Sequence, residues 1–284
     1  MITGHPPDTS SVEPAEPVTA ASIAKPQGWF TRREAILLPI LAAVLILVGW
    51  EIYGRVVGFN PLFFSYPSEI WAGFLELADG PLMEDLRISA HEFMVGLAIA
   101  LVAVPLGMLI GSMRRLRMAL DPIINGLYAT PTLALTPLFV IWFGLGIISK
   151  VAIVAIMAFF PLIINTIEGV KTVDRTLLRA ARSFGARRRH TYGDVILPSI
   201  FPFVISGLRL AIGRAIIGVV IGEFIGATAG IGYRIRQTAA VFQTQQYLAS
   251  VAILVIAAVV LNLLLRFGEA RLAPWQRRER DSGD

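Results

Sequence analysis

The sequence predicts an all-α polytopic membrane protein with about six transmembrane helices. Apolar residues make up 55% of the chain and charged residues only 16%, with a mean hydropathy of +0.68. Soluble domains carry about 25% charged residues. The apolar residues also fall in runs as long as a bilayer is thick, roughly 20 residues. The absence of cysteine excludes disulfides and thiolate metal sites, and three histidines without paired spacing predict no metal site or cofactor.

Residues 1–31 are predicted to be a disordered cytoplasmic tail, and 32–284 a transmembrane domain. The tail is rich in proline, serine, threonine, alanine and glutamate, and it buries too little apolar surface to fold alone. It lacks the short apolar core and cleavage site of a signal peptide.

Six spans follow the tail. They are predicted at 35–54, 88–112, 122–145, 148–169, 202–226 and 248–267. Prolines interrupt the third span, and the fourth follows it after a very short turn. In the long loop 55–87, the segment PSEIWAGFLELADG predicts a short amphipathic helix on the membrane surface.

Basic residues fix the orientation of these spans. One side carries eighteen of them: Lys25, Arg32, Arg33, Arg114, Arg115, Arg117, Lys171, Arg175, Arg179, Arg182, Arg187, Arg188, Arg189, Arg266, Arg271, Arg277, Arg278 and Arg280. The other side carries five: Arg55, Arg87, Lys150, Arg234 and Arg236. The positive-inside rule then places both termini in the cytoplasm. Anionic lipids suffice to explain the net charge of +5, so no nucleic-acid partner is expected.

The loop 171–200 is basic and patterned. Residues 176–181 predict a helix, Gly185 a sharp turn, and Ile196, Leu197 and Pro198 the return to the membrane. Small Ala180 and Ala181 would let another surface approach closely. From spacing alone, a loop that binds a partner and a solvated loop that only maintains the membrane topology are equally expected.

The order of these residues resembles the EAA loop of binding-protein-dependent ABC importer permeases. Ala180, Ala181, Gly185 and the Ile196-Leu197-Pro198 motif take the places of the family pattern, whereas Arg179 replaces its acidic first residue. The contact that this acidic residue makes in the family is therefore not implied for Arg179. Segments 105–122, 137–150, 159–174 and 207–233 also look like the nitrate, sulfonate and taurine branch, so the resemblance covers roughly 60–270.

This resemblance implies the type I permease fold in a bacterial inner membrane. It further implies that the loop is a coupling helix for two ABC ATPase subunits, with a periplasmic or lipid-anchored solute-binding protein on the other side. A second permease copy, as a homodimer, would complete the path. The chain has no Walker A motif, so it is expected to be a transport subunit and not an enzyme. The implied solute is nitrate, a sulfonate, taurine or a similar compound, although relatives in the branch also carry pyrimidines.

The third span contains the sequence ATPTLALTP. Pro131 and Pro137 lack an amide donor and disturb helix bonding. Thr130, Thr132 and Thr136 are placed to satisfy the freed carbonyls or to offer hydroxyls to a solute. The two interpretations are a lining of the translocation pathway and a proline kink filled by neighbouring helices.

The fifth span contains Arg209, Arg214 and Glu223. A charge inside a span costs at least about 2.5–3.5 kcal/mol at the bilayer centre, so such residues face a bundle interior or an aqueous cavity. Arg209 is near enough to the cytoplasmic end to reach lipid phosphates. Arg214 is expected either to pair with Glu223 as a structural ion pair or to meet an anionic solute in the pathway.

Glycines recur every four residues on two spans. Gly218, Gly222 and Gly226 lie on the fifth, and Gly107 and Gly111 on the second. Such small faces allow close helix packing, either within one subunit or between two.

Two other classes of protein fit the sequence less well. A secondary transporter driven by an ion gradient would need buried acidic residues at mid-span, and few are present. A membrane enzyme would need a Ser/His/Asp, paired-Asp or His-rich constellation, and none is visible in the sequence.

Overall fold

A computed structural model describes residues 29–58, 60 and 62–272, and every regular element within them is helical. The helices are α1 (Trp29–Val57), α2 (Pro67–Ala78), α3 (Leu82–Ala100), α4 (Ala103–Ser112), α5 (Arg114–Ala129), α6 (Thr132–Phe143), α7 (Ile147–Thr172), α8 (Arg175–Ser183), α9 (Arg188–His190), α10 (Leu197–Phe224), α11 (Ile231–Ala240) and α12 (Thr244–Leu272). A π-helical segment, Thr191–Ile196, joins α9 to α10.

The chain divides into two compact units between Trp50 and Glu51. The described part of the first unit is the body of α1, which is apolar around its circumference and contains Pro39. Helices of this kind suit a lipid environment. Of the tail predicted at 1–31, residues 1–28 lie outside the described residues, and 29–31 belong to α1.

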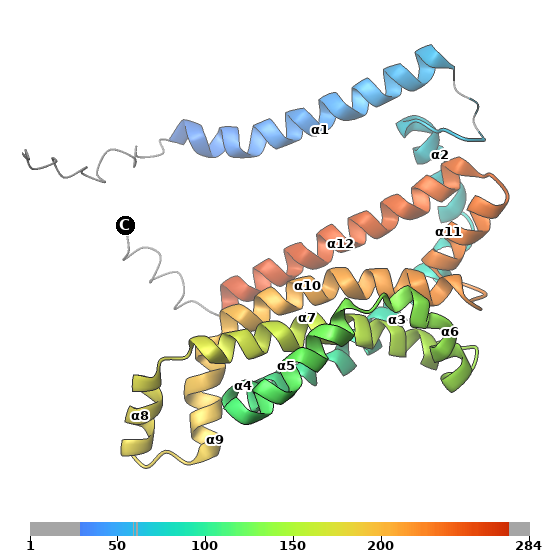
Figure 1. Ribbon diagram of the computed structural model, residues 1–284. Helices are drawn as coiled ribbons and strands as arrows, with labels where there is room; N and C mark the ends of the chain where they lie inside the picture. The colour runs from blue at the N-terminus through green and yellow to red at the C-terminus, as the bar shows by residue number, and fades with distance from the viewer. Residues whose placement is uncertain (1–28, 59, 61, 273–284) are drawn as a thin grey trace, which may run out of the picture. The chain divides into compact units, whose positions relative to one another are not determined.

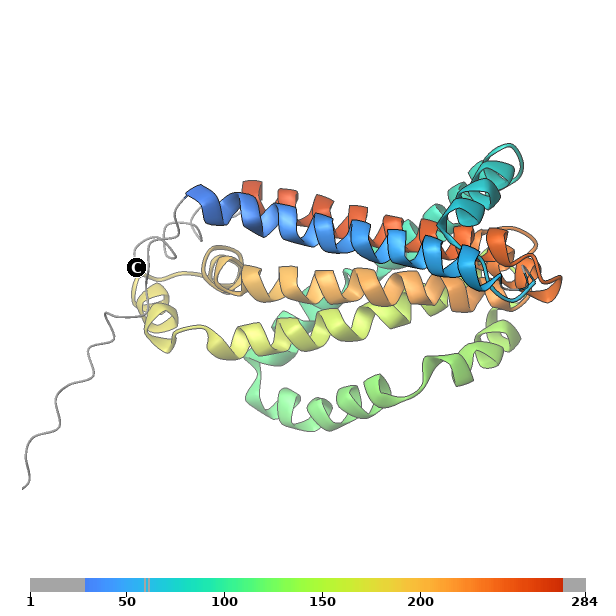
Figure 2. The same cartoon turned by 90° about the horizontal axis from the view of Figure 1, so that it is seen from above.

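In the second unit α7 is the central helix. Its side chains Val154, Ala158 and Leu162 are fully buried, and they pack with residues of α3, α4 and α10 in one apolar core. Figures 1 and 2 both show α7 running alongside α10. Because α7 is apolar on all sides, it can bury its whole surface and serve as the axis of the bundle.

Glycines allow the other helices to approach α7 closely. An added Cβ at Gly107 or Gly111 would come within 2.8 Å of Thr166 or Val170 of α7. Gly218 and Gly222 of α10 also face α7. Packing within one subunit, one of the two expected roles, is therefore confirmed for these four glycines. The expected fifth member, Gly226, lies past the end of α10 with a φ of +76°.

The predicted spans are confirmed as helices. Five described elements are long and apolar enough to cross a membrane, and α5 with α6 forms a sixth if this pair is one broken span, bent by 94°. The helix predicted in loop 55–87 is α2, whose Gly73 packs against the backbone of Gln245 in α12. Its location on a membrane surface stays a prediction.

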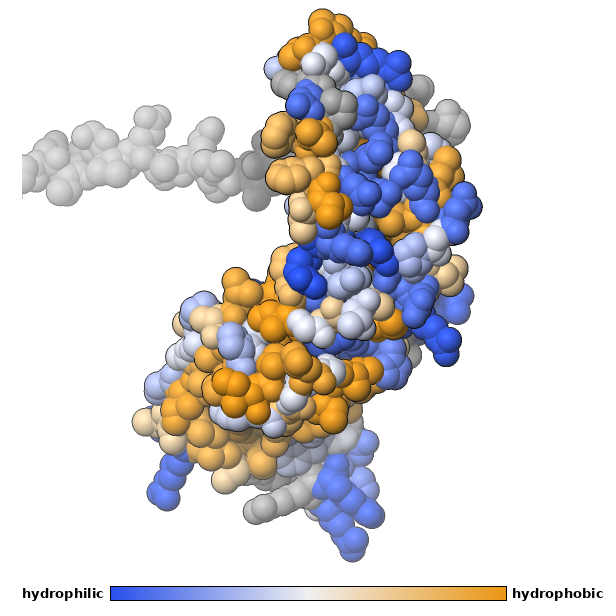
Figure 3. All heavy atoms as spheres, turned by 90° about the vertical axis from the view of Figure 1, so that its right-hand side faces the viewer, coloured by the Kyte–Doolittle hydropathy of each residue, from blue (hydrophilic) through white to orange (hydrophobic). Residues whose placement is uncertain are grey.

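Helix α8 lies at one end of the second unit and α11 at the opposite end (Figure 1). Figure 3 views the molecule from the side of the α11 end, and the lower part of this face, at the height of α6, is mostly hydrophobic. Exposed apolar residues of α6 and the segment after it include Ile141, Trp142 and Leu145. The two candidate functional regions lie at these two ends.

Candidate functional site

Helix α8 confirms the predicted helix in the loop and extends it to Arg175–Ser183. It starts at Asp174, whose Oδ1 accepts a hydrogen bond from the Thr176 N–H at 2.7 Å. Such an N-cap satisfies a backbone donor that the helix itself leaves free. Arg179 and Ala180 are exposed on this helix, and Ala181 is half-buried.

Gly185 ends α8 with a left-handed turn. Its φ is +73°, and the Ala186 N–H donates to the Ala181 carbonyl at 3.0 Å. This hydrogen bond, from an N–H to the carbonyl five residues earlier, is that of a Schellman motif, in which glycine is the favoured residue at the left-handed position. The preceding Phe184 is 92% exposed, so the turn presents an aromatic side chain to its surroundings.

The base of the loop is anchored in a small apolar cluster. Leu178 of α8 packs there with residues of α4, the link between α7 and α8, the π-helical segment and α10, namely Met108, Val173, Tyr192, Ile196 and Ile200. Ile196 is buried, whereas Leu197 and Pro198 are exposed at the first turn of α10, where proline is well tolerated. This cluster thereby joins α8 to α4 and α10.

Replacing Asp174 with alanine is expected to loosen α8. The hydrogen bonds from Thr176, together with the nearby positive charge of Arg179, hold the pKa of the Asp174 carboxyl below its usual value of 3.8. The stabilisation of α8 by the ionised Asp174 carboxyl is therefore present at neutral pH and is lost as the pH falls below 3.8 through the folded-state pKa. Hydrogen exchange across 175–183 should be faster in Asp174→Ala than in the wild type, with Asp174→Asn intermediate. Equal exchange in all three would show that this cap does not hold the helix.

The broken span places its threonines and prolines at the junction of α5 and α6. Thr130 Oγ1 donates to the Gly126 carbonyl at 3.1 Å, and buried Thr136 donates to the Thr132 carbonyl at 3.2 Å. Both hydroxyls thus satisfy carbonyls of their own helices. Pro131 lies at the break, whereas Pro137 lies within α6 without ending it.

Arg214 faces this junction and not Glu223. Its Nη2 donates to the Tyr128 hydroxyl at 3.4 Å, and its guanidinium lies 5.5 Å from the centre of the Tyr128 ring. The predicted pair with Glu223 is wrong, because nine residues are about two and a half helical turns and put the two side chains on opposite sides of α10. Arg209, five residues before Arg214 on α10, pairs with Glu269 of α12 at 3.1 Å.

Two buried ion pairs lie at the α11 end of the bundle. Lys150 Nζ of α7 lies 2.8 Å from Glu92 Oε1 of α3, and Arg234 Nε of α11 lies 2.8 Å from Asp85 Oδ2. Glu92 and Asp85 are almost completely buried. Removing one partner of such a pair leaves an uncompensated charge, so these contacts fix how α3, α7 and α11 meet.

At the same end, side chains of α3 and α10 accept hydrogen bonds from the backbone amides at the start of α11. The Gly230 N–H donates to Asp85 Oδ1 at 2.8 Å, and the Ile231 N–H donates to Ser89 Oγ at 2.9 Å. The Gly232 N–H donates to Glu223 Oε2 at 2.5 Å, and Ser89 Oγ donates to Glu223 Oε1 at 2.6 Å. Carboxylates are stabilised at the amino terminus of a helix. We call Asp85, Ser89, Glu92, Lys150, Glu223 and Arg234 the outer cluster.

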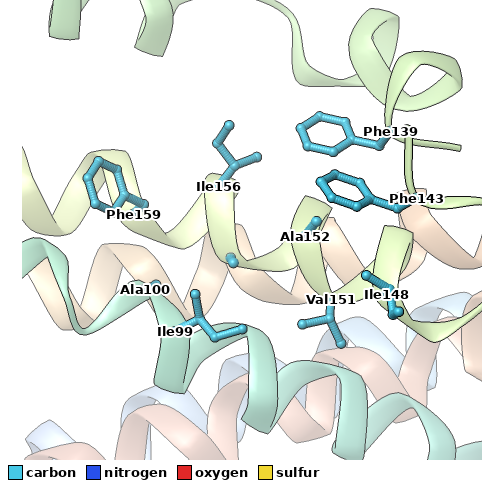
Figure 4. A pocket seen from close by; sticks show the side chains of 10 residues that line it. Ile99, Ala100, Phe139, Phe143, Ile148, Val151, Ala152, Ile156 and Phe159 are labelled. Carbon is cyan, nitrogen blue, oxygen red and sulfur yellow. The ribbon is translucent and has the colours of Figure 1, made fainter. Parts of the chain in front are cut away.

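An apolar pocket of about 360 Å³ lies between α3, α6 and α7 (Figure 4). Phe139 and Phe143 stack on its α6 side, with ring centres 6.2 Å apart. Its remaining lining residues are Ile99, Ala100, Ile148, Val151, Ala152, Ala155, Ile156 and Phe159. These side chains offer no hydrogen-bonding group to a polar solute, and none of the predicted pathway residues lines the pocket.

Sequence reasoning found the loop and the broken span but missed the outer cluster. The charge pattern counts Lys150 among the basic residues of the side opposite the cytoplasm, and the structure shows it buried in the first turn of α7. A usable signal was present, because Asp85, Glu92 and Glu223 are acids within or beside apolar runs and require partners there.

Known proteins resemble this chain over most of its length. A family model described as "Binding-protein-dependent transport system inner membrane component" matches residues 103–278. The chain is 34% identical to the taurine transport system permease protein TauC of Escherichia coli, over 87% of this chain and 92% of the relative. It is 33% identical to the putative aliphatic sulfonates transport permease protein SsuC of Bacillus subtilis, over 92% and 93%. It is 30% identical to the formylaminopyrimidine transport permease protein ThiX of Halalkalibacterium halodurans, over 86% and 97%.

Proposed function

The chain belongs to the family of binding-protein-dependent inner membrane components, the permease subunits of ABC importers, and we propose that it moves a small solute into the cytoplasm. The proposed solute is nitrate, a sulfonate, taurine or a similar compound, because two relatives are named for taurine and aliphatic sulfonates. A separate ATPase subunit supplies the energy.

One observation carries this proposal: α8 is a capped, exposed helix at the end of the bundle, tied to α4 and α10 at its base. In the proposed mechanism, α8 and the turn at Gly185 dock on the ATPase and pass its movement to the spans. Exposed Phe184 and Arg179 are the side chains best placed to contact that partner. Of the motif residues, Ile196 holds the loop against the bundle, and Leu197 and Pro198 begin α10.

The proposed assembly has two copies of this permease, two ATPase subunits at the α8 end and a solute-binding protein at the α11 end. This orientation puts both termini in the cytoplasm, in accord with the eighteen basic residues that the positive-inside rule assigns to the cytoplasmic side of the sequence. A second copy is needed because the spans of one chain are too few to enclose a path for a polar solute.

Arg214 and Tyr128 are proposed to line that path. Arg214 lies ten residues before the end of α10, which places it about 15 Å along the helix from that end. The hydrocarbon core is about 30 Å thick, so this exposed guanidinium is near its middle. Beside it lies the break at Thr130 and Pro131, and broken helices at this depth line cavities. An anion is the solute that such a group attracts.

Replacing Gly185 with aspartate tests the coupling role. The full chain is co-expressed with its ATPase, reconstituted in lipid nanodiscs, and assayed for ATPase retention and turnover. Gly185→Asp is expected to lose most of both, because a side chain is strained at a φ of +73° and the docking turn would change.

Gly193→Asp is the matched control, since it adds the same carboxylate to an exposed glycine of the same loop without a positive φ. It is expected to keep the ATPase. If both variants behave like the wild type, or if the wild type retains no ATPase, the coupling role of the loop is wrong.

A further inference from the structure

The outer cluster contains more buried negative than positive charge. Asp85, Glu92 and Glu223 supply three carboxyl groups, each at most 1% exposed, while Lys150 and Arg234 supply two cations. Arg234 is engaged with Asp85 and Lys150 with Glu92. The carboxyl group of Glu223 is left without a cation of its own, and an unpaired ionised carboxylate in such a place is strongly unfavourable.

Glu92 and Glu223 lie close together. Glu223 accepts a hydrogen bond from Ser89 Oγ at 2.6 Å, and Ser89 lies three residues before Glu92, on the same face of α3. Glu92 Oε1 accepts from Lys150 Nζ, whereas Glu92 Oε2 is buried and has no partner among the described residues. Two neighbouring carboxylates repel each other unless one of them carries a proton. A proton between the two groups would satisfy Glu92 Oε2 and remove the repulsion.

The remaining neighbours decide which group holds the proton. Among the charged and titratable neighbours, Lys150 of α7 pairs with Glu92, exposed His91 precedes Glu92 on α3, and Arg234 of α11 pairs with Asp85 of α3. Lys150 at 2.8 Å favours the ionised form of Glu92. Glu223 meets neutral donors, the Ser89 hydroxyl and the Gly232 amide.

We propose that Glu223 is a neutral carboxylic acid that donates its proton to Glu92 Oε2, so that the outer cluster is a proton-binding site. With this proton the cluster is electrically neutral, and it clamps the first turn of α11 onto α3 and α10. Separation of α11 from α10 would admit water to Glu223 and release the proton. The position of α11 is thereby linked to the binding of one proton.

Infrared spectroscopy of the full chain tests this site directly. The protein is labelled with side-chain ¹³C-glutamate and purified in dodecyl maltoside, which has no ester carbonyl to mask the signal. At neutral pH exposed carboxyls are ionised. The wild type is expected to show the C=O stretch of one protonated glutamic acid per chain, and Glu223→Gln should lose it.

Two further variants complete the test. Glu92→Gln removes the charged proton acceptor and leaves Glu223 to pair with Lys150 as a carboxylate, so it should lose the band as well. Glu269→Gln changes the half-buried partner of Arg209 and should keep it. Absence of the band from the wild type, or its persistence in Glu223→Gln, would overturn the proposal. If Glu223→Gln does not fold, persistence of the band in Glu92→Gln overturns it instead.

Discussion

Replacing Lys150 with methionine is expected to lower the free energy of unfolding by about 3–5 kcal/mol, the cost of leaving a buried charge without its partner. Lys150 Nζ lies 2.8 Å from Glu92 Oε1, and Glu92 is fully buried. The methionine keeps the apolar stem of the side chain, so the loss reports on the charge and not on a cavity. Unfolding of the purified chain by dodecyl sulfate in mixed micelles measures the difference.

A matched pair of variants separates this ion pair from ordinary surface electrostatics. Arg209→Met removes a cation from the same bundle, but Arg209 is half-exposed and pairs with Glu269 at 3.1 Å, so the expected loss is below about 1 kcal/mol. The double variant Lys150→Met with Glu92→Met should recover most of the stability, because an apolar pair replaces a buried ionic one. A loss in Lys150→Met no greater than in Arg209→Met would contradict this account.

The spans and the loop were predictable because their signals are local. A run of about 20 apolar residues marks a span wherever it packs. Gly185 after a short helix predicts a left-handed turn, and the chain has a φ of +73° there. Pro131 likewise marks the break between α5 and α6.

The outer cluster was not predictable in the same way, because its contacts join distant parts of the chain. Lys150 is 58 residues from Glu92, and Ser89 is 134 residues from Glu223. No sequence spacing sets these distances; they follow from how α3 and α10 pack on α7. The expected pair of Arg214 with Glu223 shows the converse. Both residues are on one helix, and helical periodicity alone was enough to exclude the contact.

The threonines of the broken span illustrate a third case. The sequence allowed their hydroxyls either to satisfy carbonyls or to face a solute. Thr130 and Thr136 both bond to carbonyls four residues earlier. Side chains of this type commonly bond back to their own helix, so this local contact competes with any role toward a solute.

Replacing Gly230 with alanine is expected to lower the free energy of unfolding by about 3 kcal/mol or more, from two separate costs. At φ +120° and ψ 160°, Gly230 occupies a region that side chains avoid, at a cost of about 1–3 kcal/mol. An added Cβ would also overlap the carboxyl group of Glu223. Overpacking of a buried site adds typically about 1–3 kcal/mol. The same dodecyl sulfate titration measures the sum.

Two glycines outside the outer cluster separate these costs. Gly144, with a φ of +77° and a ψ of 175°, occupies the same region with open space around its Cα, so Gly144→Ala carries the backbone strain alone, about 1–3 kcal/mol. Gly213 lies in α10 with equally open space, and Gly213→Ala should leave stability unchanged or raise it by up to about 1 kcal/mol. If Gly230→Ala costs no more than Gly144→Ala, the carboxyl group of Glu223 does not hold α11 against the bundle. A larger cost, with faster hydrogen exchange confined to α11, identifies this close approach of backbone to carboxyl group as what holds the α11 end together.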